Sequence, residues 1–101
     1  QAVKHMCADM LIEIDATRVA VMFAAMTADD PAELAVATPL VKAQAADTFK
    51  VCAANAIQVH GGIAFTWEHD LHLYFRRAKT TEALFGSSNH NRALLADRIG
   101  I

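Results

Sequence analysis

Apolar residues recur at spacings of three, four and seven from the start of the chain, which is the period of an amphipathic α-helix. They are Val3, Met6, Cys7, Met10, Leu11, Ile14, Val21 and Met22. This pattern predicts a helix from about Gln1 to Thr27, roughly 40 Å long at 1.5 Å per residue. Asp29-Asp30-Pro31 should end it, because a proline disfavours helical geometry at the preceding residue and favours a new helix start at its own position.

The second helix is predicted from Pro31 to Val59. Pro39 lies inside this segment, so we expect either a kink or a true helix start near Thr38, with the threonine hydroxyl as N-cap. Residues 40–57 are rich in alanine, which would let neighbouring helices approach closely.

Two shorter helices follow a loop from Gly61 to Thr66. One is predicted from Trp67 to Leu84, and the other from about Ser88 to Arg98, capped by the turn at 86–89. No strand signal exceeds three residues. The sequence therefore predicts an all-α fold, an antiparallel (up-down) four-helix bundle, in one domain over residues 1–101.

The composition is that of a folded protein, with 54% apolar and 20% charged residues. A net charge of -2 and the lack of a basic stripe beyond Arg76-Arg77-Lys79 argue against nucleic-acid binding. No apolar run approaches the roughly 20 residues of a membrane span, and no signal peptide is visible, so we expect a cytoplasmic location. Cys7 and Cys52 are expected to be buried thiols. The first helix pattern starts without a capping residue, so we expect a fragment of a longer protein.

The side chains that most often act in catalysis or metal binding do not form a recognisable catalytic or metal site in the sequence. Glu68, His69 and His72 are close on one predicted helix, but the first helix offers acids only on its polar side, so no metal site is predicted. No nucleophile motif and no dinucleotide or P-loop fingerprint is present. From the residues alone, the pair Gly61-Gly62 indicates either a close approach to the backbone or a turn through positive φ.

Several segments carry a resemblance when they are taken together and in order. They are QAVKHMCADM, Arg18, PLVKAQAAD, IQVHGGIAFTWEHDLHLYFRRAK and FGSSNHNR. In this combination, over essentially the whole chain, they resemble the C-terminal helical domain of the acyl-CoA dehydrogenases. The resemblance implies a flavoenzyme that also has an N-terminal helical domain and a middle β domain and that usually assembles as a tetramer.

The resemblance also implies that FAD is the cofactor. In the family, a Gln-x-x-Gly-Gly segment packs against the FAD of a neighbouring subunit, and a side chain at Gly62 would stand where that cofactor lies. A Thr-x-Gln pair after the third helix hydrogen-bonds FAD. The matching positions in this chain are Gln1, Gln58, Gly61, Gly62, Ser87 and Asn89. Gly86 would lie near the acyl thioester.

The position of the catalytic base departs from the family. The family's reaction removes the α-proton of an acyl-CoA thioester while a hydride leaves the β-carbon, so a carboxylate must act as base. In many members that glutamate directly precedes the glycine of the last turn, where this chain has Phe85, so no catalytic residue is assigned. Three explanations stay open: a base upstream of Gln1, a catalytically silent subunit beside an active neighbour, or substitution by Glu82 or His90.

The leading hypothesis is the C-terminal domain of a flavin-dependent acyl-CoA dehydrogenase. Its partners would be an acyl-CoA thioester, the rest of its own chain, and neighbouring subunits of a homo- or hetero-oligomer. The alternative is a catalytically silent helical subunit or a protein-interaction bundle. A second departure is Arg77, where the family commonly has aspartate, which reverses a charge near the expected subunit interface.

Overall fold

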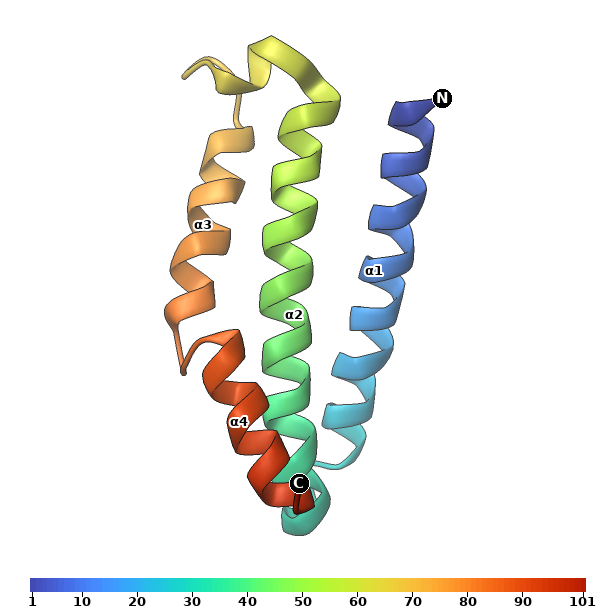
Figure 1. Ribbon diagram of the computed structural model, residues 1–101, viewed down its shortest axis with the longest axis vertical. Coiled ribbons are helices and arrows are strands. Elements are labelled where there is room, and N and C mark those ends of the chain that lie inside the picture. Colours follow the sequence, from blue (N-terminus) through green and yellow to red (C-terminus); the bar gives the residue numbers. More distant parts are fainter.

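The computed structural model describes all residues from Gln1 to Ile101 as helices joined by short turns. The helices are α1 (Ala2–Met26), α2 (Pro31–His60), α3 (Leu71–Ala83) and α4 (Ser88–Ile99), with a 3₁₀ helix, η1 (Gly61–Phe65), between α2 and α3. α1 packs along one side of α2, and α3 and α4 follow one another along another side, all antiparallel to α2 (Figure 1). The predicted all-α antiparallel bundle is confirmed, with α2 as its central helix.

The helix boundaries follow local capping chemistry. One oxygen of the Asp30 carboxylate accepts hydrogen bonds from the backbone N–H groups of Ala32 at 3.0 Å and Glu33 at 3.2 Å, so α2 begins at Pro31 as predicted. The hydroxyl of Ser87 accepts from the N–H of His90 at 3.2 Å and begins α4.

The prediction of a helix start near Thr38 is wrong, because α2 continues through Pro39 without interruption. The Thr38 hydroxyl donates to the carbonyl of Leu34 at 2.7 Å instead of capping a new helix. Pro39 has no N–H to offer the carbonyl of Ala35, and the guanidinium of Arg98 in α4 donates to that carbonyl instead. A tertiary contact therefore replaces the missing helical hydrogen bond.

The third helix begins at Leu71, four residues later than predicted. Residues 66–70 form turns, in which the Thr66 hydroxyl donates to the carbonyl of Ile63 at 2.7 Å. The N–H of Leu71 donates to Nδ1 of His69 at 3.3 Å. The His69 ring thus accepts a hydrogen bond from one of the free N–H groups at the start of α3. The spacing of hydrophobic residues does not predict this contact.

Small residues of α2 form most of the core, as the alanine-rich stretch indicates; they include Ala37, Ala43, Ala46 and Ala53. α1 contributes no buried residue and faces α2 along one narrow seam, in which the hydroxyl of Thr17 donates to that of Thr48 at 2.8 Å. The expectation that Cys7 is buried is wrong, because it lies off this seam and is exposed, whereas Cys52 is half-buried. No helix combines the length and apolarity needed to cross a bilayer.

Candidate functional site

The C-terminal end of α2 turns at Gly61, the first glycine of the pair. Its backbone has φ 73° and ψ -152°, a conformation that disfavours any side chain. The N–H of Gly61 donates to the carbonyls of Gln58 and Ile57, which closes the helix. Turn geometry within the chain therefore accounts for glycine at this position.

Turn geometry does not account for Gly62. Its φ is not positive, and a Cβ placed on it would meet no atom within 4 Å. An alanine methyl group would therefore fit within the chain at this position without a clash or backbone strain. A bare backbone that faces outward leaves room for a group from outside the chain to approach closely.

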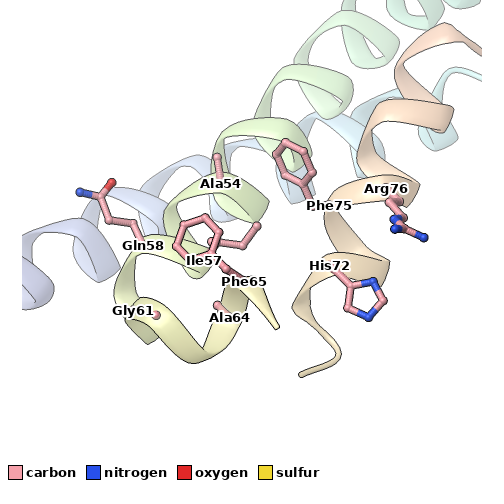
Figure 2. Close-up of a pocket in the computed structure, with 10 residues that line it drawn as sticks. Ala54, Ile57, Gln58, Gly61, Ala64, Phe65, His72, Phe75 and Arg76 are labelled. Atoms are coloured by element: carbon pink, nitrogen blue, oxygen red, sulfur yellow. The ribbon is translucent and has the colours of Figure 1, made fainter. Parts of the chain in front are cut away.

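Both glycines line a groove of about 710 Å³ between the end of α2, η1 and α3 (Figure 2). Its other lining residues are Ala54, Ile57, Gln58, Ala64, Phe65, His72, Phe75 and Arg76. The groove has an apolar lining with polar groups at its edges, as small-molecule sites usually do. In Figure 2 the Gln58 amide lies at the edge opposite His72 and Arg76 and points away from them.

The α3 side of this groove carries a stacked cationic and aromatic cluster. The guanidinium carbon of Arg76 lies 4.4 Å from the centre of the Trp67 ring, which favours one orientation of the cation. The His72 ring meets Trp67 edge-on at 4.9 Å, and its Nδ1 is the only buried side-chain polar atom without a hydrogen-bond partner. Sequence analysis missed His72 and Arg76 as groove residues, although their spacing of four places them on one helix face.

The turn between α3 and α4 is the second place where predicted site residues gather. Phe85 has φ 60°, which is unusual for a bulky residue, and the residue is 90% exposed. Gly86 follows with φ 91°, and a Cβ on it would lie 2.5 Å from Cδ2 of His90. Phe85 is therefore held in a backbone conformation that costs free energy and that other contacts must maintain, whereas Gly86 adopts its positive φ without this cost.

Asn91 supplies those contacts. Its side chain is buried, and its Nδ2 donates to the carbonyls of Phe85 at 3.3 Å, Gly86 at 3.1 Å and Ser87 at 3.0 Å. A single amide thus binds three successive carbonyls of the turn. Sequence analysis did not single out Asn91, because nothing in the local pattern shows that its side chain folds back on the turn.

Ser88 and Arg92 attach the same turn to α2. The hydroxyl of Ser88 donates to one carboxylate oxygen of Asp47 at 2.7 Å, and the guanidinium of Arg92 binds the other. Burial alone would raise the pKa of Asp47, but these two hydrogen bonds and the positive charges of Arg92 and Lys50 hold it below its ordinary value. Asp47 is therefore an anionic anchor between α2 and α4.

A smaller groove of about 390 Å³ lies beside this turn, between α2 and α3. It is lined by Lys42, Ala45, Ala46, Phe49, Arg77, Thr81, Leu84 and Phe85. Lys42 donates to the carbonyls of Thr81 at 2.9 Å and Glu82 at 3.3 Å, at the end of α3. Phe85 at the expected base position is thus part of an apolar wall.

The predicted site residues fall into two groups that the chain does not bring together. Gln1, Gln58, Gly61 and Gly62 lie at the end of the molecule where α1 begins and α2 finishes (Figure 1). Gly86, Ser87 and Asn89 lie beyond the other end of α3, which has 13 residues and is therefore about 20 Å long. Ser87 already accepts the helix-capping hydrogen bond, whereas the side chain of Asn89 is exposed.

Known proteins resemble the chain over nearly its full length. Residues 1–100 match the family model described as acyl-CoA dehydrogenase, C-terminal domain. The acyl-CoA dehydrogenase IpdE2 of Mycobacterium tuberculosis is 45% identical over 87 residues, which cover 86% of this chain and 26% of that protein. The acyl-CoA dehydrogenase FadE34 of the same organism is 43% identical over 90 residues, covering 87% of this chain and 13% of that protein.

A more distant relative is the mitochondrial short-chain specific acyl-CoA dehydrogenase of Rattus norvegicus, 26% identical over 99 residues that cover 98% of this chain and 24% of that protein. The chain thus spans about a quarter or less of the length of these relatives. No solved structure matches it. The resemblance predicted from the motifs is confirmed: the chain belongs to the acyl-CoA dehydrogenases, a flavin-dependent family, and corresponds to their C-terminal helical domain.

Proposed function

We propose that the chain is the C-terminal part of a flavin-dependent acyl-CoA dehydrogenase and that it contributes FAD contacts and one wall of the acyl site. The observation that carries the proposal is Gly62. No contact or backbone conformation within the chain requires a glycine there, and the residue borders a groove of cofactor size. The groove and its edges fit a large ligand with planar and anionic parts, since they combine aromatic rings, an amide and a guanidinium.

FAD, when bound, would accept the hydride that leaves the β-carbon of the acyl group. The residues of this chain would bind and orient it: Gly61 and Gly62 through bare backbone, and Gln1 and Gln58 through their amides. Ser87 and Asn89 would offer hydrogen bonds at the other end of α3, with Gly86 close to the thioester. Because these two groups lie about one helix length apart, we infer that they act on well-separated parts of the bound ligands.

The proton acceptor of the reaction is not assigned to this chain. Phe85 has no proton-accepting group, and the Glu82 carboxylate is paired with Lys50 at 3.3 Å on the α2 side. The His90 ring lies against the Gly86 turn. These placements favour a base on a preceding segment of the chain or on a partner subunit. Because Phe85 replaces the acid, the second candidate function is a catalytically silent subunit that completes the flavin site of an active neighbour.

The test uses the full-length subunit, co-expressed with its partner if it has one. We expect a yellow protein, and we expect Gly62→Leu to lose FAD, because the added side chain would occupy the space of the cofactor. The matched control is Ala25→Leu, which introduces the same leucine side chain, with one carbon fewer added, at an exposed position near the far end of α1. A colourless wild-type protein that cannot be reconstituted with FAD would contradict the proposal.

Anaerobic mixing with acyl-CoA locates the base. In an active enzyme, saturating acyl-CoA should bleach the flavin, and bleaching should survive Phe85→Ala but not removal of the true carboxylate. A yellow assembly that never bleaches would support the silent subunit.

A cytoplasmic location stays a prediction.

A further inference from the structure

We propose that the groove beside Phe85 selects acyl thioesters whose acyl body ends in a second carboxylate, with Phe85 against the apolar body and Arg77 on the distal carboxylate. This inference rests on the proposed function, because it places the thioester end of the substrate near Gly86. It assigns to the chain a substrate class and two specificity-determining residues.

Phe85 is presented to the groove at a conformational cost. Its left-handed backbone disfavours a bulky residue, and its ring is almost fully exposed in the chain as it stands. Asn91 maintains this conformation through hydrogen bonds to the carbonyls of residues 85–87. The buried amide thus fixes the backbone that carries the exposed ring, so little backbone freedom is left to lose when a ligand covers the ring.

The wall next to Phe85 suits an alkyl body. Ala45, Ala46, Phe49 and Leu84 line the groove with apolar groups, and its volume of about 390 Å³ lies within the range of small-ligand sites. Phe85 adds a flat apolar face at the end nearest Gly86. An acyl chain whose thioester lies by the turn would therefore run along this wall, away from the turn and toward the start of α3.

The charges along the groove leave one cation without a partner. Lys42 donates to two carbonyls at the end of α3, and Lys50 is paired with Glu82. Arg77 is exposed and forms no ion pair or side-chain hydrogen bond in the chain, yet it lines the groove. The groove thus has an apolar wall and a free guanidinium, which is the complement of an apolar ligand with a terminal carboxylate.

The spacing of the two residues sets the length of that ligand. Arg77 lies six positions before the end of α3 at Ala83, about 9 Å at 1.5 Å per residue, and two further residues outside the helix lead to Phe85. A ten-carbon dicarboxylic acyl group can bridge this separation between a thioester at the turn and a carboxylate at the guanidinium.

The experiment measures equilibrium binding of decanoyl-CoA, decanedioyl-CoA and CoA alone to the full-length flavin-loaded assembly. The two thioesters have the same number of carbons and differ in the distal carboxylate. We expect the wild-type protein to bind decanedioyl-CoA about fivefold more tightly, as for one partly exposed ion pair, with a preference that shrinks at high salt. Arg77→Gln should abolish the preference and Arg77→Glu should reverse it.

Two further variants separate the roles. Phe85→Asn removes the ring but tolerates the left-handed backbone, so it should fold and should weaken both thioesters about tenfold while leaving CoA unchanged. Arg18→Gln removes one positive charge from an exposed ion pair on α1 and should leave the preference intact.

Equal wild-type affinity for the two thioesters, or a preference that persists in Arg77→Gln, would overturn this inference while leaving acyl-CoA binding, and with it the proposed function, in place. A yellow protein that binds neither thioester, or a protein without flavin, would instead overturn the proposed function and this inference with it.

Discussion

The two ends of α3 use glycine for opposite purposes. At the start, η1 carries Gly61 and Gly62, and a Cβ on either would meet nothing within 4 Å. At the other end, a Cβ on Gly86 would collide with His90, and three consecutive carbonyls share the amide of Asn91. The second turn is therefore determined by contacts inside the chain, whereas the first needs glycine at Gly61 for its turn and keeps Gly62 next to space that the chain does not fill.

The difference indicates how each end takes part in binding. An open glycine pair next to a groove is suited to a ligand that lies against the main chain. A turn held in a strained conformation is suited to presenting particular groups at fixed positions, here Phe85 and Gly86. Substitutions at the two ends should consequently separate folding from binding.

The largest expected effect on stability is that of Asn91→Asp. The carboxylate cannot donate a hydrogen bond, and it would face the carbonyl oxygens of residues 85–87 in a buried position, so we expect a destabilisation of about 3 kcal/mol. Urea unfolding followed by the helical signal measures it. Asn91→Leu is the comparison, because it loses the same hydrogen bonds without adding a charge and should cost less. Equal unfolding curves for wild type and Asn91→Asp would show that the amide does not hold the turn.

The next effect is that of Gly86→Ala, for which we expect about 2 kcal/mol. Alanine would adopt the positive φ unfavourably, and its Cβ would lie 2.5 Å from His90 Cδ2 and 3.2 Å from Asn91 Nδ2. The double variant Gly86→Ala/His90→Ala should recover part of the loss, since it removes the closer contact but not the backbone strain. Full recovery would show that the strain at residue 86 is unimportant.

Much of the architecture was predictable because it depends on local chemistry. The helix starts at Pro31 and Ser88 follow from an aspartate and a serine that cap the next residues of the chain. The error at Pro39 arose because a distant residue decides the outcome. Pro39 predicts a kink or a helix start near Thr38, but α2 continues through it, and Arg98, far along the chain, donates to the Ala35 carbonyl that the proline leaves without a partner.

In the candidate site, too, some features could be predicted from the local sequence and others depend on how the helices pack. The motif positions Gln58, Gly61 and Gly62 were predicted through the family resemblance, and they do line one groove. The other side of that groove, with His72 and Arg76, depends on how α3 packs beside α2. The separation of Ser87 and Asn89 from the first group likewise depends on the length of α3, and Asn91 was missed because its hydrogen bonds fold back on preceding residues.

A smaller effect concerns the attachment of α4 to α2 through Asp47. Because the pKa of this carboxyl is lowered in the folded protein, its contribution is present above the unfolded value near 3.8 and is lost as the pH falls through the lower folded value. Asp47→Asn should cost less than about 1 kcal/mol at pH 7, since the ion pair with Arg92 is partly exposed. Unfolding measured at pH 7 and at pH 3 should show the difference between wild type and variant shrinking at the lower pH. A difference that grew instead would mean that Asp47 is not stabilised as an anion.

The smallest effect on stability is expected at Gly62, and it is the most informative about function. Gly62→Ala places a methyl group in open space on an ordinary backbone, so it should stabilise the fold slightly, by up to about 0.5 kcal/mol, through the lower entropy of the unfolded chain. Gly61→Ala is the matched control, and it should destabilise by about 1 kcal/mol because Gly61 has φ 73°. Thermal unfolding measures both variants, and flavin content measured in the full-length assembly should fall for Gly62→Ala although its fold is not weakened. If Gly62→Ala were as destabilising as Gly61→Ala, turn geometry would account for both glycines, and the pair would no longer indicate a ligand from outside the chain.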